Sequence, residues 1–490
     1  MKFLSLDVGT TCCKCQVFSG DGEILFYKSI EYPLKKIGED MYVDITLLTA
    51  TVKKLIKSAT KNHEISSIAV SSFGEAFALL DKDDKLLFYP MLYTDVRGEG
   101  QAKKIKKKFG EKFLYQTTGV LPHAMYSISK LLWIKENYPE IFEKADKVLL
   151  IGDYVGYVLS GKRVIDYALA ARTGAFDIQN KRFSEKILTE LGIYKGVFST
   201  PMCAGSIVGT VGKQIAKELN LGGDCKLVLG SHDQVCATLG AGVISAGQAA
   251  DGMGTVECIT ALYSSPPKDL EFGRMGYPTV PFAIDGVYCT YILNYSSGSL
   301  VNWFKNNVIH GYSADKQNFF EYIEEKIKDK PNNLLLLPYF AGSATPYQDG
   351  SAKGAILNLT LSTEDSDIYR AILEGTSFEM KLNLEVVKEF GIEIDSAIAT
   401  GGGANSSKWL SIKADVTGLK LKTLRSVEGG LCGVAMLQSV ALNNHKDLED
   451  AKNTFVRYAK EFLPSREDKR IYDEKYKKYK KIYKTLKEIN

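Results

Sequence analysis

The first residues suited to chemistry lie near the start of the 490-residue chain, in Asp7-Val8-Gly9-Thr10-Thr11. A glycine between two strands lets backbone N–H groups approach a phosphate, because no Cβ blocks the way. The threonine hydroxyls add hydrogen-bond donors, and Asp7 offers Mg²⁺ a hard oxygen ligand. A plain β-turn would have the same composition, so this segment alone leaves both interpretations open.

Two glycine segments in the second half of the chain offer related chemistry. Gly252-Met253-Gly254-Thr255 repeats the first turn, and two such turns could grip one polyphosphate from both sides. Thr400-Gly401-Gly402-Gly403-Ala404-Asn405 follows an expected strand and precedes an expected helix, whose N-terminus favours a phosphate or sugar oxygen. The alternative for this third segment is a flexible loop in which Asn405 or Ser406 caps the helix.

A fourth segment, Gly230-Ser231-His232-Asp233-Gln234, places a carboxylate where a strand ends and a helix begins. Functional side chains often lie at this position in open α/β sheets. The helix dipole should keep Asp233 ionised at neutral pH. Asp233 could instead only cap a helix over residues 234–240, although the two roles do not exclude each other. Ser231, His232 and Asp233 are adjacent and cannot fold onto one another as a hydrolase triad.

Alternating strand and helix patterns surround these segments and predict an α/β fold. The patterns predict strands near residues 2–6, 15–18, 24–27, 65–71, 334–337 and 397–400. They predict helices near residues 46–60, 98–109, 127–137, 297–307, 314–328, 365–389 and 406–417. After Gly242 the opening pattern restarts at residues 248–263, which suggests an internal duplication with a boundary near residues 243–247.

Composition and length narrow the class of protein. A chain of 490 residues with 45% hydrophobic and 24% charged residues fits two or three globular domains. A net charge of +4 gives no reason to expect a nucleic-acid partner. The nine cysteines show no zinc spacing, which favours free thiols in a reducing cytoplasm. We expect neither a signal peptide nor a membrane span, because no apolar stretch of about 18 residues occurs.

Walker A and Rossmann fingerprints are absent from the sequence, which argues against a P-loop enzyme and a nicotinamide dehydrogenase. Residues 466–490 form a lysine-rich helix with Tyr472, Tyr476, Tyr479 and Tyr483 on one stripe. We expect this stripe to dock on the body of the protein.

Together these segments resemble the FGGY carbohydrate kinases, which include glycerol kinase and xylulokinase. The resemblance runs from residue 3 to about residue 445. It rests on ordered motifs at residues 7–11, 92–97, 130–133, 153–154, 166–172, 230–234, 337–340, 374–375 and 401–404.

The resemblance implies two ribonuclease-H-like domains of the actin and hexokinase type with an interdomain cleft. Residues 1–244 would form the sugar-binding domain that carries Asp233. Residues 245–490 would form the ATP-binding domain and end in the helix at 466–490. The reaction would transfer the γ-phosphoryl group of ATP to a hydroxyl, expected to be primary, of a pentulose, a hexulose or a polyol. The enzyme would be cytoplasmic, and a homodimer is compatible with the sequence.

The resemblance also assigns roles to residues. Asp233 would be the general base and Asp7 the Mg²⁺ ligand. The sugar would be bound by Glu75, Asp95, Arg97, Asp233 and Gln234. The ATP contacts would come from Gly9, Thr10, Thr11, Gly254, Thr255, Gly402, Gly403, Ala404 and Asn405.

Three departures from the family pattern bear on the substrate. Glu75 matches the glutamate of the Arg-Glu pair in glycerol kinase, but Gly74 lacks the arginine. Met125 stands roughly where glycerol kinase has a tyrosine, and Cys12 replaces a common serine. The departures at Gly74 and Met125 argue against assigning either glycerol or D-xylulose as the sugar, whereas Cys12 removes one hydroxyl on the phosphate side and leaves the backbone donors in place. An actin- or chaperone-like ATPase and a non-catalytic sugar-responsive regulator remain as alternatives on the same fold.

Overall fold

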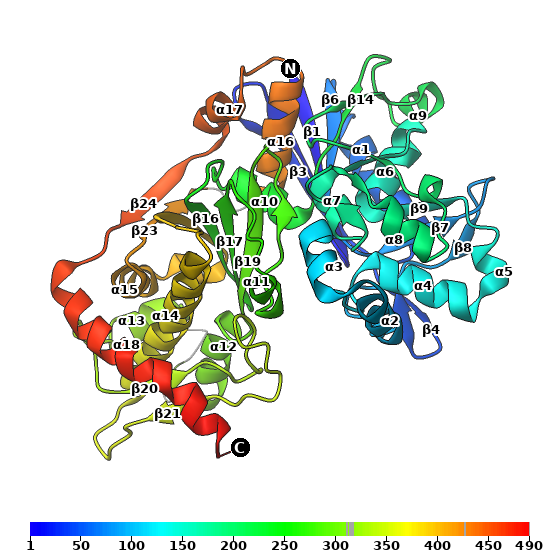
Figure 1. Cartoon of the computed structure of the whole chain (residues 1–490). Helices are drawn as coiled ribbons and strands as arrows, with labels where there is room; N and C mark the ends of the chain where they lie inside the picture. The colour runs from blue at the N-terminus through cyan, green and yellow to red at the C-terminus, as the bar shows by residue number, and fades with distance from the viewer. Residues whose placement is uncertain (310–311, 313–317, 426–427, 490) are drawn as a thin grey trace. The chain divides into compact units, whose positions relative to one another are not determined.

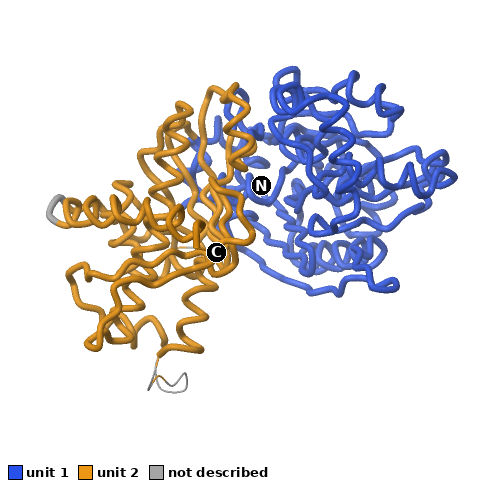
Figure 2. The backbone as a smooth tube through the Cα atoms, turned by 60° about the horizontal axis from the view of Figure 1, so that its bottom comes forward, with its two compact units in different colours: residues 1–244, 279–288, 428–456 blue, residues 245–278, 289–427, 457–490 orange. Residues whose placement is uncertain are grey.

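The computed structural model describes residues 1–309, 312, 318–425 and 428–489. The chain divides into two compact units (Figure 2). The first contains residues 1–244, 279–288 and 428–456, and the second contains residues 245–278, 289–427 and 457–490. Two segments from the later part of the chain therefore belong to the first unit. In the described part of the chain, no helix is both long and apolar enough to cross a membrane.

The first unit is built around a six-stranded sheet with the order β14-β15-β6-β1-β2-β3 (Figure 1). Its strands are β1 (Lys2–Val8), β2 (Cys12–Ser19), β3 (Ile24–Glu31), β6 (Ser67–Ser72), β14 (Ile207–Thr210) and β15 (Lys226–Val228). β1 pairs antiparallel with β2 and parallel with β6, which in turn pairs parallel with β15. All six residues of β6 are buried, as expected for a parallel strand covered on both faces.

Two helices of the first unit touch at their backbones. These are α10 (Asp233–Gly240) and α16 (Gly429–Ala441). A Cβ on Gly240 would lie only 1.8 Å from the carbonyl oxygen of Gly429, and one on Gly433 would lie 2.1 Å from that of Cys236. Glycine at both positions is therefore what lets α16 approach α10, the helix that begins at Asp233.

The first unit contains further strands and helices outside this six-stranded sheet. Its further strands are β4 (Lys35–Ile37), β5 (Asp40–Tyr42), β7 (Phe77–Leu80), β8 (Leu86–Phe88), β9 (Lys147–Leu150), β10 (Val164–Asp166), β11 (Phe176–Asp177), β12 (Arg182–Phe183), β13 (Thr200–Met202) and β18 (Val280–Pro281). Its further helices are α1 (Ile45–Ala59), α2 (Glu99–Phe109), α3 (Glu111–Thr118), α4 (Ser127–Asn137), α5 (Pro139–Phe142), α6 (Ile151–Ser160), α7 (Tyr167–Ala171), α8 (Glu185–Glu190), the 3₁₀ turn η1 (Lys195–Val197), α9 (Lys213–Glu218) and α17 (Leu448–Phe455).

The second unit repeats the strand pattern of the first. Its sheet runs β19-β17-β16-β22-β23-β24. These strands are β16 (Gln248–Met253), β17 (Glu257–Tyr263), β19 (Tyr288–Asn294), β22 (Ser396–Thr400), β23 (Lys420–Leu424) and β24 (Tyr458–Phe462). β16 pairs antiparallel with β17 and parallel with β22, which pairs parallel with β23. The internal duplication suggested by the sequence is therefore visible in strand order and direction.

The helices of the second unit agree well with the sequence patterns. They are α11 (Leu270–Arg274), α12 (Gly298–Asn307), α13 (Phe319–Glu324), α14 (Asp365–Glu389), the 3₁₀ turn η2 (Gly402–Asn405), α15 (Ser407–Thr417) and α18 (Arg466–Lys487), with β20 (Leu335–Leu337) and β21 (Ala355–Leu357) as a separate pair. The helix predicted over residues 314–328 is shorter in the structure, and residues 313–317 lie outside the described part. The tyrosine stripe of α18 is buried, as predicted.

Candidate active site

Three segments of the first unit meet at one edge of its sheet. β1, β6 and β15 are neighbours and run parallel, so their carboxyl ends lie side by side. Asp7 lies near the end of β1, and Ser72 ends β6. The amide of Ser72 donates to the carbonyl of Ser231, 3.3 Å away, and this ties the end of β6 to the segment that carries Asp233. This edge is where open α/β sheets place their ligands.

The turn after β1 has the tight geometry that its glycine predicts. The amide of Gly9 donates to the carbonyl of Cys12 at 2.9 Å, and a Cβ on Gly9 would press on that same oxygen at 2.9 Å. Gly9 and Thr10 are half-buried and Thr11 is exposed, so the turn is reachable by a ligand. The Tyr32 hydroxyl donates to the carbonyl of Gly9 at 2.5 Å and helps to hold the turn in this conformation.

Asp7 lies beside a lysine that the sequence patterns did not single out. Lys14 stands opposite Asp7 in the β1–β2 register, and its ammonium donates to the carboxylate of Glu428 at 3.0 Å. Burial raises the pKa of Asp7, while the nearby Ser71 hydroxyl and the charge of Lys14 act to lower it. Lys14 shares one face of β2 with Cys12 and Gln16, and this two-residue strand period was the available signal.

A single carboxylate such as Asp7 fits magnesium better than a metal that needs a full set of protein ligands. Among the described residues, no group of three or more His, Cys, Asp or Glu side chains is arranged to hold a metal ion. Mg²⁺ typically binds through one or two carboxylates, keeps several waters and takes its other ligands from substrate phosphates. Asp7, next to a phosphate-sized turn, meets that requirement.

Asp233 is the first residue of α10, and the residue before it, His232, occupies the N-cap position without a side-chain capping bond. The Asp233 carboxylate accepts a hydrogen bond from its neighbouring amide, that of Gln234, at 2.6 Å, and its Oδ1 lies 3.2 Å from the Nε2 of His232. The alternative in which Asp233 serves as the helix cap is therefore wrong. Gln234 itself is exposed.

The expectation that the helix dipole keeps Asp233 fully ionised is also wrong. The side chain of Asp233 is 37% exposed, but loss of solvent around its carboxylate raises its pKa to about 7. The charges of Asp7 and Glu75 also raise this pKa, while the Gln234 amide and the charge of Arg172 act to lower it. Burial and the same Arg172 hold the pKa of His232 well below its usual range, so this imidazole is neutral. Asp233 therefore titrates near physiological pH beside a neutral histidine, as a group tuned for proton transfer does.

Glu75 is paired with an arginine that lies 97 residues away in the chain. The Arg172 Nε donates to Glu75 Oε1 at 2.6 Å, and its Nη2 contacts the same oxygen. The guanidinium lies over the ring of Tyr126, 5.2 Å from the centroid. Glu75 is 4% exposed and has a φ of +62°, a backbone strain that clusters at functional sites. Gly74 carries no side chain, and the cation that binds Glu75 is Arg172.

Asp95 and Arg97 bind each other. The Nε of Arg97 lies 3.0 Å from both carboxylate oxygens of Asp95, while its Nη1 reaches Asp40 at 2.9 Å and the Tyr42 hydroxyl at 2.6 Å. Burial acts to raise the pKa of Asp95, but the hydrogen bonds and charge of Arg97 outweigh it and lower that pKa. These two sequence-predicted sugar contacts are therefore joined as one ion pair.

Lys130 connects the Asp95 and Glu75 regions. Its buried ammonium donates to the carbonyls of Ala124 at 3.1 Å and Met125 at 2.9 Å. Burial lowers the pKa of Lys130 to about 8, although the charges of Glu75 and Asp95 act to raise it. The lysine thus fixes the loop that leads to Tyr126.

The predicted nucleotide segments of the second unit pack against each other. A Cβ on Gly401 would lie 2.9 Å from the carbonyl of Met253, and one on Gly403 would lie 2.8 Å from the Met253 Cβ. Gly402, by contrast, has open space where its Cβ would point. Ser406 accepts from the Trp409 amide at 3.0 Å and is the cap of α15. The exposed positions left for a ligand here include Thr255, Gly402 and Asn405, and Ala404 is half-buried.

A buried ion cluster underlies this turn and was not found from the sequence. Lys413 of α15 donates to Asp251 at 2.6 Å and also contacts Glu257. Asp251 and Glu257 flank residues 252–256, so Lys413 holds both stems of the turn. The hydroxyl of Ser297 donates to the second oxygen of Glu257 at 2.8 Å, and the amide of Gly298 donates to the carbonyl of Gly254 at 3.0 Å.

Comparison with known proteins places this geometry in a family. Residues 2–240 match the N-terminal domain model of the FGGY family of carbohydrate kinases, and residues 253–442 match its C-terminal domain model. The chain belongs to the FGGY family of carbohydrate kinases. The resemblance stated from the ordered motifs is thereby confirmed, and so is the ribonuclease-H-like, mixed α/β fold.

Individual relatives of this FGGY chain act on different acceptors. It is 27% identical to the xylulose kinase of Bacillus subtilis over 499 positions, covering 100% of this chain and 98% of the relative. It is also 27% identical to the gluconokinase of Bacillus subtilis, covering 89% of this chain and 86% of the relative. The solved structure of xylulose kinase from Rhodospirillum rubrum superposes with a TM-score of 0.90 at 20% identity, covering 100% of this chain and 99% of that one.

Membership settles the reaction class. The chain is a phosphotransferase with an alcohol group as acceptor, and it uses ATP with Mg²⁺. The motor-type ATPase and the non-catalytic regulator are set aside by the same finding. The identity of the acceptor differs among relatives and does not follow from membership.

Proposed function

We propose that this kinase transfers the γ-phosphoryl group of ATP to a primary hydroxyl of a ketose of five or six carbons, or of a related polyol, with Asp233 as general base. The position of Asp233 carries the proposal. It stands at the carboxyl edge of the parallel strands, close enough to Asp7 and Glu75 for both charges to raise its pKa. Asp233 thus lies near both the proposed metal ligand, Asp7, and the proposed sugar contact, Glu75.

In this proposal the first unit binds the sugar. Glu75, held by Arg172, accepts hydroxyl hydrogen bonds, and Asp95, paired with Arg97, lies near enough to Lys130 for its charge to raise the pKa of that lysine. Arg97 and Arg172 each already bind a carboxylate, and Lys130 binds two backbone carbonyls, which suits a neutral polyhydroxyl ligand. Gln234, exposed in the first turn of α10, adds an amide beside the base.

The second unit supplies most of the nucleotide contacts. Gly254 and Thr255 in one turn, and Gly402, Gly403, Ala404 and Asn405 in η2, contact ATP in this proposal. Thr10 and Thr11 of the first unit offer amides to the transferred phosphate, and Gly9, whose own amide is bonded to Cys12, leaves room for it. Asp7 holds Mg²⁺, which neutralises charge on the phosphates. Asp233 takes the proton of the attacking hydroxyl late in the step.

A substrate panel tests this proposal. Purified protein is mixed with Mg-ATP and with ketopentoses, deoxyhexuloses, ketohexoses, glycerol, xylitol and gluconate, and ADP release is followed together with ³¹P NMR of the product. We expect a ketose or its polyol to give the highest kcat/KM and a product phosphorylated at a primary carbon. Gluconate or glycerol as the best substrate would contradict the proposed acceptor class.

A further inference from the structure

Asp166 joins two segments that come from different parts of the first unit. It ends β10 and caps α7, where its carboxylate accepts from the amides of Ala168 at 2.9 Å and Leu169 at 3.3 Å. Its Oδ2 also accepts from the hydroxyl of Ser231 at 2.6 Å, across 65 residues of sequence. Asp166 is 1% exposed and Ser231 is fully buried.

Each end of this connection leads to a residue of the proposed site. α7 ends at its C-cap Arg172, whose guanidinium holds Glu75. Ser231 lies two residues before Asp233 in the segment that joins β15 to α10. The Ser231–Asp166 hydrogen bond therefore links the sugar-side ion pair to the segment that carries the base.

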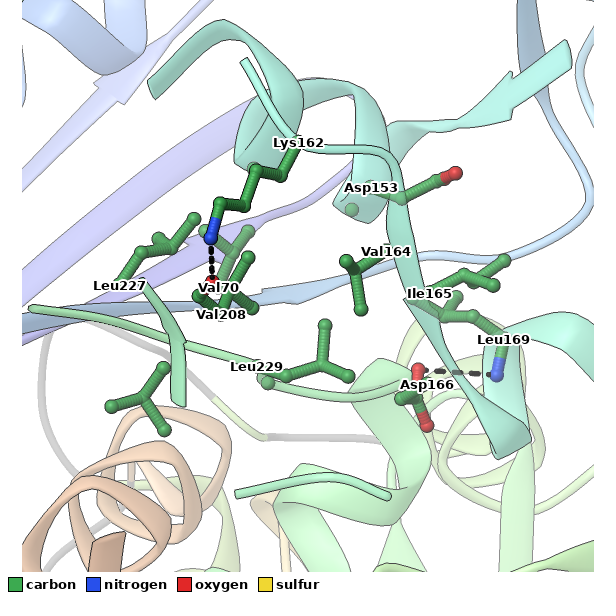
Figure 3. Close-up of a pocket in the computed structure, with 14 residues that line it drawn as sticks. Val70, Asp153, Lys162, Val164, Ile165, Asp166, Leu169, Val208, Leu227 and Leu229 are labelled. Atoms are coloured by element: carbon green, nitrogen blue, oxygen red, sulfur yellow. Dashed lines mark hydrogen bonds between the residues drawn. The ribbon is translucent and has the colours of Figure 1, made fainter. Parts of the chain in front are cut away.

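The surroundings make this hydrogen bond hard to replace. Asp166 lies at the edge of a small cavity of about 20 Å³, whose wall is mostly aliphatic and includes Val70, Leu227 and Leu229 (Figure 3). Burial raises the pKa of Asp166 to about 6, while the hydrogen bonds from Ser231 and the α7 amides act to lower it. A buried carboxylate depends on such bonds, since unpaired polar groups are costly in an apolar setting.

We propose that Asp166 and Ser231 are positioning residues for phosphoryl transfer, which hold Asp233 at a fixed distance from the Arg172–Glu75 pair. The inference rests on the proposed role of Asp233 as base. A general base must lie within about 2.6–3.2 Å of the proton that it removes. A displacement of about 1 Å at such a site can cost on the order of 10²-fold in rate.

The chain offers a matched control for this pair. Ser199, which is 2% exposed, donates its hydroxyl to Asp153 at 2.5 Å, so it is a second buried serine bonded to a buried aspartate in the same unit. Asp153 lies in α6, near the same cavity, but neither partner belongs to the segments that carry Arg172 or Asp233. Ser231→Ala and Ser199→Ala thus each remove a buried serine–aspartate hydrogen bond. Only the Ser231 bond connects the segment of Arg172 to the segment of Asp233.

The test measures kcat, both KM values and melting temperature for the two variants of the full-length enzyme, with the best sugar from the panel and Mg-ATP. We expect similar losses of melting temperature in both variants. Only Ser231→Ala should lower kcat, by about tenfold or more, with the KM for ATP within about twofold of wild type. Ser231→Cys, measured with a reductant present, keeps a weaker donor and should fall between wild type and Ser231→Ala.

Equal kcat values for Ser231→Ala and Ser199→Ala, with Asp233→Asn inactive, would overturn the positioning role and leave the base in place. An Asp233→Asn variant that keeps wild-type turnover would instead overturn the proposed base. If Ser231→Ala does not fold, the kcat of Ser231→Cys decides, and a value equal to wild type rejects the positioning role.

Discussion

Removing Lys413, which lies under the turn at residues 252–256, should lower both the stability of the protein and its proposed affinity for ATP. Lys413 and its partners Asp251 and Glu257 are each at most 1% exposed. In Lys413→Met the two carboxylates lose their shared cation while staying buried. Breaking a buried ion pair by removing one partner costs about 3–5 kcal/mol.

This loss in the free energy of unfolding predicts a measurable fall in melting temperature. For a cooperative unit of about 200 residues, each kcal/mol lowers the melting temperature by about 2–4 °C, so we expect a loss of about 6–20 °C. Burial already raises the pKa of Glu257 to about 7, and Lys413 acts to lower it. Without Lys413 that pKa rises further, so the folded variant binds protons more tightly than the unfolded chain. Its stability deficit should therefore grow as the pH rises from 6 to 8.

The assay compares Lys413→Met with Lys475→Met by thermal melting and by ATP titration. Lys475 of α18 contacts the buried Glu374 of α14, but Glu374 keeps Arg370 as a partner at 2.8 Å, so this control should lose less stability. We expect only Lys413→Met to raise the KM for ATP, by about tenfold (roughly 1.4 kcal/mol), with the sugar KM unchanged. An equal rise in both variants, or a melting loss below about 2 °C in Lys413→Met, would refute the reasoning.

Three further substitutions probe the ligand contacts one at a time. Gly402→Ala adds a methyl group in open space, so melting should be unchanged while the Kd for ATP, measured by calorimetry, rises; unchanged affinity removes Gly402 from the nucleotide site. Glu75→Gln should raise the sugar KM by about tenfold or more, because a buried polar site binds its ligand weakly when one of its groups is left unpaired. The KM for ATP should stay near wild type. Asp7→Asn should lose most turnover and shift the Mg²⁺ requirement upward, and an unaltered Mg²⁺ titration would contradict its role as the ligand.

Local patterns were enough to predict much of this molecule. α14 occupies residues 365–389, as its pattern predicted, and β1, β2 and β3 follow the expected order at the start of the chain. The glycine turns were found because their chemistry is local: a missing Cβ is visible in the sequence itself. The ordered motifs then gave the family.

Pairings between distant residues could not be predicted in this way. Glu75 was singled out, but its partner Arg172 is 97 residues away, and Lys14 meets Glu428 across 414 residues. The pKa of Asp233 was misjudged for the same reason. Its helix position favours the anion, but loss of solvent and the neighbouring carboxylates of Asp7 and Glu75, which lie in other segments, decide the outcome. The effects of residues that are distant in the sequence on one pKa can be added together only when the folded structure shows which residues are neighbours.

The central claim is that Asp233 is the general base, and the kinetics of Asp233→Asn test it most directly. The asparagine keeps the shape and can still accept from the Gln234 amide, but it cannot take a proton. We expect kcat to fall by about 10²–10⁴-fold while ATP and the sugar still bind, and we expect the acid limb of the wild-type kcat/KM profile to lie near pH 7, the pKa of Asp233 in the free enzyme.

Melting of the same variant adds a second readout with a definite sign. The pKa of Asp233 is higher in the folded than in the unfolded protein, so the ionised carboxylate lowers stability above pH 7, and Asp233→Asn should melt no lower than wild type at pH 8. Nearly wild-type kcat, within threefold, combined with a lower melting temperature would show that Asp233 serves the helix and not the reaction.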